Sequence, residues 1–191
     1  MSDLQGKIDF ILELEKLKAV LRKTRPVGLA RYENSAEHSW QTTLTALVLL
    51  DEVDQPLDAL KVLKMLLIHD VVEIDAGDVF VYDAQARADI AEQELAAAKR
   101  IFGLLPAELG QELLDLWLEF EARETAESKF AKAMDRINPV LQNLSSKGQS
   151  WVENNITRDQ VIAINSEIAT VNPALWAILK KRIDAAPFFN A

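Results

Sequence analysis

Apolar residues recur along the chain at intervals of three and four positions, the spacing that places them on one face of an α-helix. This pattern predicts helices over most of the sequence: residues 4–22, from Asn34 through Leu50, from Pro56 to near Gly77, residues 84–102, residues 106–122, from Thr125 to a kink or stop at Pro139, and residues 158–181. No stretch sustains the alternation of a β-strand. We therefore expect an all-α fold.

Local signals add detail to these helices. Asn34 is typical of an N-cap, and Glu37 three positions later completes a capping box. We expect Trp40 and Trp117 to lie in the core, because helical spacing points Trp40 away from the neighbouring His38. The apolar side of the first helix is formed by Leu4, Ile8, Ile11, Leu12 and Leu17.

The composition indicates one folded domain over residues 1–191, since a chain of this length with 49% hydrophobic residues can bury a substantial core. The sequence has no cysteine, which excludes a disulfide scaffold, a thiolate zinc site and a cysteine nucleophile. The first residues carry acids within their apolar pattern, unlike a signal peptide, and the longest apolar runs are too short to span a bilayer. We expect a cytoplasmic protein without a membrane partner.

The net charge of −9 argues against binding to nucleic acid, which needs a basic surface to displace counterions. It does not argue against a small phosphorylated substrate. One local arginine and a divalent cation can bind a single phosphate whatever the global charge.

The chain has only two histidines, and one of them begins an acidic segment. His69 and Asp70 follow the apolar run 65–68, where buried polar groups need partners. Glu73, Asp75 and Asp78 come next, and a bound cation would relieve the repulsion among these acids at the C-terminal end of a helix. The alternative interpretations are local hydrogen bonding by the His-Asp pair and a solvated acidic loop.

His38 lies in the first turn of its predicted helix, and Asp135 lies far along the chain among alanines. Taken alone, His38 fits a surface or capping histidine, and Asp135 fits a surface pair with Arg136.

Together these segments resemble the HD superfamily of metal-dependent phosphohydrolases. The resemblance depends on the order of a single His, then His-Asp, then a distant Asp, each on a different helix. The segments 37–39, 69–73, 77–78 and 126–135 are similar to the branch that holds the 5′-deoxynucleotidases. The resemblance covers about residues 8–145 and implies a helical bundle with a C-terminal helical extension over about 146–191.

The resemblance implies specific roles for the residues that match. His38, His69, Asp70 and Asp135 would hold a divalent metal ion (Mn, Co, Fe, Zn or Mg), a choice of ions that suits two imidazoles and two carboxylates. Glu73 would handle protons at the reacting centre, and Asp78 would lie near the sugar or leaving group. Arg22 would bind phosphate, although it also fits a cation at a helix C-terminus. The resemblance further implies a homodimer.

One position departs from the pattern. Some members of the branch have an aromatic residue directly after the arginine, where it lines the base pocket, and this chain has Lys23. Lys23 or Arg25 could add a phosphate contact and so suit a more highly charged substrate.

The leading hypothesis is hydrolysis of a nucleoside or deoxynucleoside 5′-monophosphate to nucleoside and phosphate. The same metal site could instead act on a nucleoside triphosphate, a cyclic nucleotide or a signalling nucleotide, for which Lys23, Arg25 and Arg31 would be the relevant residues. A helical interaction domain with a structural metal is the third hypothesis, and a closed ligand shell would distinguish it.

Overall fold

Helices and short turns build the protein throughout residues 2–189, the part of the chain that the computed structural model describes. No β-strand occurs among these residues, and the prediction of an all-α fold is confirmed. The α-helices are α1 (Asp3–Leu14), α2 (Ser35–Leu49), α3 (Ala59–Ile68), α4 (Glu73–Ala76), α5 (Ala84–Asp89), α6 (Ala91–Phe102), α7 (Ala107–Ala122), α8 (Ala126–Ser145), α9 (Gln149–Glu153), α10 (Arg158–Asn165), α11 (Ile168–Val171) and α12 (Pro173–Asp184). Three 3-10 helices complete the order, at Glu15–Ala19, Leu50–Glu52 and Pro187–Phe189.

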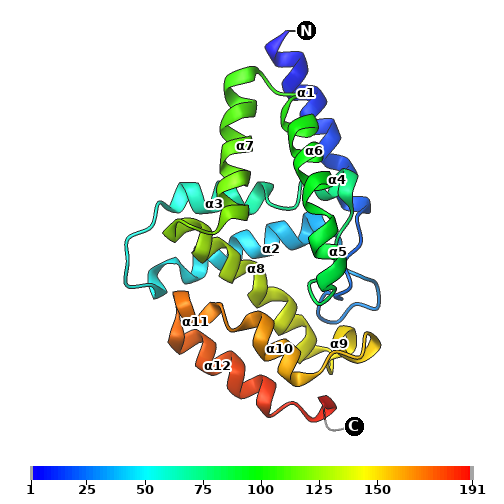
Figure 1. Cartoon of the computed structure of the whole chain (residues 1–191), viewed down its shortest axis with the longest axis vertical. Helices are drawn as coiled ribbons and strands as arrows, with labels where there is room; N and C mark the ends of the chain where they lie inside the picture. Colours follow the sequence, from blue (N-terminus) through cyan, green and yellow to red (C-terminus); the bar gives the residue numbers. More distant parts are fainter. Residues whose placement is uncertain (1, 190–191) are drawn as a thin grey trace.

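Three helices, α2, α3 and α8, pack against one another at the centre of the molecule (Figure 1). Helices α1, α6 and α7 lie on the N-terminal side of this centre, and α10, α11 and α12 lie on the other side. The hydrophobic core that joins α2, α3 and α8 also includes Trp151, Val161, Ile168 and Ile183 from the C-terminal helices. Residues 146–189 therefore share their core with the helices that carry the predicted site. The predicted domain also includes residues 1, 190 and 191, which lie outside the described part.

The capping box at the start of α2 is present as predicted. The Asn34 side chain accepts a hydrogen bond from the Glu37 backbone N–H, and the Glu37 side chain accepts one from the Asn34 backbone N–H. This reciprocal pair satisfies two backbone donors that a helix start leaves free. The capping box fixes where α2 begins, and it therefore fixes the position of His38, which directly follows Glu37 in the helix.

Several predicted helix boundaries are wrong. The first helix ends at Leu14 and gives way to a 3-10 helix, and α3 begins at Ala59 rather than Pro56 because Asp58 caps it. The predicted helix over residues 84–102 is divided at Ile90, and the one over 158–181 is divided into α10, α11 and α12. In the last case Asn172 caps α12 and Pro173 occupies its first position, a combination that starts a new helix.

Pro139 does not stop its helix, because α8 continues to Ser145. Proline removes the backbone donor that would bond the carbonyl four residues earlier, which here belongs to Asp135. Buried neighbours hold the helix together across this gap: Ile137 and Val140 are almost fully covered, and Asn143 donates to the Pro139 carbonyl. The α8 helix therefore runs unbroken from the predicted metal ligand to the C-terminal core.

The two tryptophans expected in the core differ in burial. Trp117 is buried and its indole N–H donates to the His69 carbonyl at 3.2 Å. The prediction for Trp40 is wrong, because this side chain is 62% exposed. The predicted apolar side of the first helix is likewise mostly exposed. Of its five residues only Leu17 is buried, and it lies in the 3-10 helix that follows α1.

Among residues 2–189, no helix combines the length and the apolar character that crossing a membrane requires.

The contact between α7 and α6 yields a prediction. Gly110 is buried, and a Cβ atom at this position would lie 2.5 Å from the Phe102 carbonyl oxygen. Gly110→Ala should therefore destabilise the protein by about 1–3 kcal/mol, although helix propensity alone favours alanine by about 1 kcal/mol. Urea unfolding measures this difference, with the exposed Ala107→Gly as the control. A rise in stability on Gly110→Ala would contradict the close packing.

Candidate metal centre

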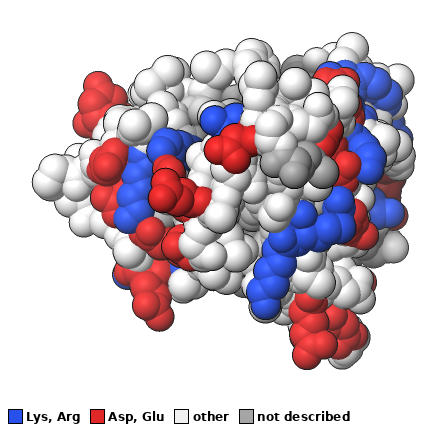
Figure 2. Space-filling model, turned by 90° about the horizontal axis from the view of Figure 1, so that it is seen from above, with Lys and Arg blue, Asp and Glu red and all other residues white. Residues whose placement is uncertain are grey.

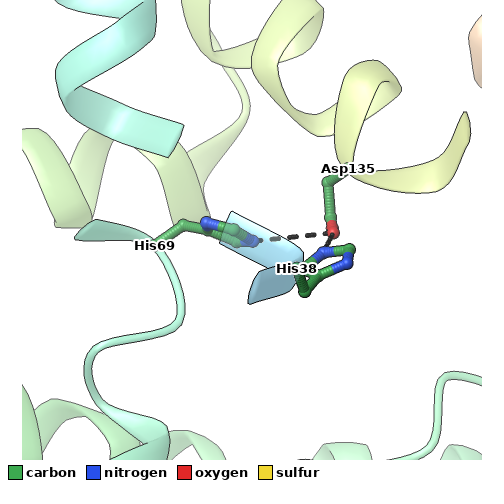
Figure 3. Close-up of side chains that lie close together, drawn as sticks. All are labelled: His38, His69 and Asp135. Atoms are coloured by element: carbon green, nitrogen blue, oxygen red, sulfur yellow. Dashed lines mark hydrogen bonds and ion pairs between the residues drawn. The ribbon is translucent and has the colours of Figure 1, made fainter. Parts of the chain in front are cut away.

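Two histidines and an aspartate from three different helices meet at the centre of the fold (Figure 3). His38 comes from the first turns of α2, His69 is the C-cap of α3, and Asp135 comes from the middle of α8. All three are buried, and His38 is 0% exposed. The packing of α2, α3 and α8 therefore brings together side chains that are up to 97 residues apart in the sequence.

The geometry of these three residues suits a metal ion. The Asp135 Oδ1 atom lies 2.9 Å from His38 Nε2 and 3.6 Å from His69 Nε2. One ligand atom from each residue lies within 4.8 Å of the others. Imidazole nitrogens and a carboxylate oxygen are ligands that divalent transition metals accept.

The hydrogen bonding of His69 supports the same interpretation. The Nδ1 atom lies 2.7 Å from the Leu66 carbonyl oxygen, which can only accept, so Nδ1 donates and the ring is held in one orientation. The Nε2 atom is buried without a hydrogen bond in the described chain, and it faces carboxylate oxygens of Asp70 at 3.1 Å and Asp135 at 3.6 Å. A ring oriented through one nitrogen, with the other turned toward carboxylates, is typical of a metal-ligating histidine. The residues present thus fit a divalent cation.

A buried glutamate that the sequence analysis missed supports His38. Glu33 Oε2 lies 3.4 Å from His38 Nδ1, and its carboxylate accepts hydrogen bonds from Thr24 and Gln142. Burial and the Arg22 charge lower the pKa of His38, but its contacts with Asp135 and Glu33 outweigh them and raise that pKa to about 9. The anionic surroundings of His38 therefore favour positive charge at the ring, and a metal cation would compete with the proton.

Asp70 lies at the edge of this cluster. Its Oδ1 atom is 3.1 Å from His69 Nε2, and its Oδ2 atom is 3.9 Å from His38 Nε2. The same Oδ2 accepts a hydrogen bond from Arg22 Nη1 at 2.9 Å. Asp70 is thus placed between the histidines and the arginine, and its role as a fourth metal ligand stays a prediction.

Arg22 lies in the site rather than at a helix end, so its interpretation as a helix C-terminal cation is wrong. The nearest helical turn ends at Ala19, and the Arg22 backbone N–H donates to the Glu33 carbonyl. The guanidinium lies 3.4 Å from Asp78 and 3.7 Å from Glu73, in addition to its bond with Asp70. These carboxylates raise its pKa although burial opposes this.

Glu73 and Asp78 both face Arg22 from within the cavity. Burial and the neighbouring Asp70 charge raise the pKa of Glu73 well above its ordinary value, with Arg22 acting in the opposite direction. The Ser35 hydroxyl donates to Glu73 and orients it. Burial likewise raises the pKa of Asp78. A buried carboxyl group with a raised pKa is suited to accept and return a proton.

One residue of the acidic segment lies outside the site. Asp75 points away from the site and pairs with Arg100, so it does not belong to the acids that converge there.

A lysine that the sequence analysis missed lies beside Asp135. The Nζ atom of Lys132, one turn before Asp135 on α8, is 3.4 Å from Asp135 Oδ2 and 4.4 Å from the centroid of the Phe120 ring. Despite burial, Lys132 and the histidines lower the pKa of Asp135 well below its ordinary value. The spacing of Lys132 from Asp135 was the available signal.

A cavity of about 230 Å³ opens beside these residues. Its lining includes six residues of the predicted site: Arg22, His69, Asp70, Glu73, Asp78 and Asp135. Of the basic residues considered for phosphate binding, Lys23 also lines the cavity, whereas Arg25 pairs with Glu153 and Arg31 pairs with Glu37.

Comparisons with known proteins agree with this arrangement. Residues 14–176 match the family model described as HD domain. The bovine 5′-deoxynucleotidase HDDC2 is 34% identical over 137 residues, and the human HDDC2 is 29% identical over the same length. The match covers 69% of this chain and 65% and 66% of those two proteins, so the chain spans just under two thirds of their length.

Solved structures show the same architecture. The crystal structure of a predicted metal-dependent phosphohydrolase from Magnetospirillum magnetotacticum superposes with a TM-score of 0.93 at 41% identity, over 99% of this chain and 95% of the other. The PH0347 protein from Pyrococcus horikoshii superposes with a TM-score of 0.68 at 24% identity, which shows the fold alone.

The metal centre can be tested with a matched pair of variants. Asp135→Asn should weaken the binding of Mn²⁺ to metal-stripped protein by at least about tenfold, because it removes a ligand charge. Asp75→Asn should leave the affinity unchanged, since Asp75 pairs with Arg100 outside the site. Calorimetric titration measures both. Equal affinities in the two variants would exclude Asp135 as a ligand.

Proposed function

This chain belongs to the HD domain family, and we propose on that basis that it is a metal-dependent phosphohydrolase that releases phosphate from deoxynucleoside 5′-monophosphates. The observation that carries the proposal is a single cavity whose lining includes His69, Asp70 and Asp135 together with Arg22 and Glu73. The bovine and human relatives named as 5′-deoxynucleotidases support the substrate class.

We assign the metal to His38, His69, Asp70 and Asp135, with its identity open among Mn, Co, Fe, Zn and Mg. When bound, a divalent cation lowers the pKa of a coordinated water and polarises the phosphoryl group. The cavity beside the ligands leaves room for substrate, which favours a catalytic metal over a structural one. The single HD domain would include residues 146–191, because the C-terminal helices complete the core.

Each remaining polar residue has a role that follows from its position. Arg22 binds phosphate oxygens: Nη1 is held by Asp70, and Nη2 makes no hydrogen bond within residues 2–189. Its fixed charge stabilises the negative charge that develops on those oxygens. Glu73 takes the proton of the attacking water and returns it to the leaving oxygen, and Asp78 lies toward the leaving group.

The test is a screen of metal-stripped protein reloaded with Mn, Co, Mg or Zn. The panel contains ribo- and deoxynucleoside monophosphates, triphosphates and cyclic nucleotides, and the readout is released phosphate, pyrophosphate and nucleoside. We expect metal-dependent phosphate release from deoxynucleoside monophosphates. If the protein hydrolyses only triphosphates or only cyclic nucleotides, the assignment to deoxynucleoside monophosphates is wrong and that other class is the substrate.

A glutamate variant tests the proton transfer in the same assay. Glu73→Gln should bind metal as wild type does and lower kcat by about 10²–10⁴-fold, because an amide cannot take the proton. Glu108→Gln, at an exposed position on α7, is the matched control. Full activity of Glu73→Gln would remove the assigned role.

We also propose that the protein acts in the cytoplasm as a homodimer, with the exposed side of α2 as the contact between subunits. Trp40, Leu44, Leu47 and Val48 share one side of this helix, and Val48 is 72% exposed. A contiguous apolar surface of this kind is typical of an interface.

Val48→Glu should convert the dimer to a monomer, because association would bury an unpaired carboxylate. Light scattering coupled to size-exclusion chromatography measures the mass. The control is Val152→Glu, an exposed valine on α9 away from α2. A wild-type protein that is monomeric at high concentration would contradict the proposal.

A further inference from the structure

The cavity is lined by a second group of charged side chains that the proposed reaction does not use. This group consists of three arginines from three different elements: Arg87 on α5, Arg123 just after α7, and Arg136 on α8. The proposed metal ligands His69, Asp70 and Asp135 line the same cavity. A ligand bound at the metal ligands therefore shares its cavity with the arginines.

The three arginines do not each have a carboxylate partner of their own. Arg136 Nε lies 2.9 Å from Glu167 Oε1, and Arg123 Nη1 lies 3.7 Å from Glu167 Oε2, so one carboxylate serves both. The Arg123 Nε atom is buried without a hydrogen-bond partner in the described chain. Within residues 2–189, the Arg87 guanidinium makes no hydrogen bond or ion pair, and only the backbone N–H of this residue is bonded, to the Asp83 carbonyl.

The proximity of the three arginines affects the pKa of Arg87. Burial lowers its pKa, and the charges of Arg136 and Arg123 lower it further, while Glu167 and Glu121 oppose them. Glu94 and Glu121 also line the cavity, but Glu121 lies 3.9 Å from Lys132, and burial raises the pKa of Glu94. A bound anion would relieve the repulsion among the arginines.

Figure 2 shows one face of the molecule on which basic and acidic side chains are interspersed. In the cavity, by contrast, Arg123 and Arg136 share a single carboxylate, that of Glu167.

We propose that Arg87, Arg123 and Arg136 bind a second phosphate group of the substrate, remote from the phosphate that is hydrolysed. The guanidinium group suits phosphate because its planar set of donors bonds two oxygens at once. The substrate class would then be a nucleotide with a phosphate at each end of its sugar. This inference rests on the proposed function and specifies its substrate.

The experiment compares two probes, 2′-deoxyadenosine 5′-monophosphate and 2′-deoxyadenosine 3′,5′-bisphosphate. Their affinities are measured by calorimetry in the Glu73→Gln background loaded with Mn²⁺, where hydrolysis does not interfere. We expect the bisphosphate to bind about tenfold more tightly, the effect of one good charge-assisted contact. Adding Arg87→Gln should remove most of this difference and leave the monophosphate affinity unchanged.

Two variants serve as controls. Arg158→Gln changes an exposed arginine on α10 whose only ion pair in the described chain is with its neighbour Asp159, and it should alter neither affinity. Arg87→Lys keeps the charge and should retain part of the preference for the bisphosphate.

Equal affinities for the two probes in the parent protein would overturn the inference, and so would a preference that Arg87→Gln leaves intact. Phosphate release by the wild-type enzyme is measured separately with both probes. Failure to hydrolyse either one would remove the proposed function, whereas the ratio of affinities would still decide whether the arginines bind a second phosphate.

Discussion

The Arg22 guanidinium is the charge around which the centre of this protein is organised. Glu33, Asp70, Glu73 and Asp78 all lie within 3.7 Å of it, and each of these carboxylates is shielded from water. Burying a carboxylate costs several kcal/mol unless an opposite charge compensates it. One arginine cannot neutralise four acids, so the site carries excess negative charge. Burial, together with the neighbouring Asp70 charge, raises the pKa of Glu73, and the excess negative charge makes a divalent cation favourable at the neighbouring histidines.

Helix α8 connects the parts that this charge arrangement requires. Its Asp135 contacts His38, its Lys132 pairs with Asp135, and its Arg136 belongs to the group of arginines that lines the cavity. Its last turns then anchor the C-terminal segment, where Asn143 Oδ1 accepts hydrogen bonds from the backbone N–H groups of Ser150 and Trp151. Since Trp151 also lines the cavity, the C-terminal helices take part in shaping the site as well as the core.

The two groups of charged side chains that line the cavity have different proposed roles. The group with His69 and Asp135 provides the proposed cation site and the proton-transfer residue, and so would determine the reaction. The group with Arg87 and Arg123 presents positive charge to the rest of the substrate. We expect relatives that differ in the arginine group to keep the chemistry and change the substrate.

The sequence by itself determined the helical fold class and the capping box of α2, because each is encoded by spacing over a few positions. His38, His69 and Asp135 could be related to one another only through a family resemblance, and the packing of α2, α3 and α8 brought them together. Glu33 and Arg87 gave no local signal, since their partners lie on other elements. Apolar spacing also misplaced Trp40, because periodicity identifies an apolar face but does not show whether another part of the chain covers it.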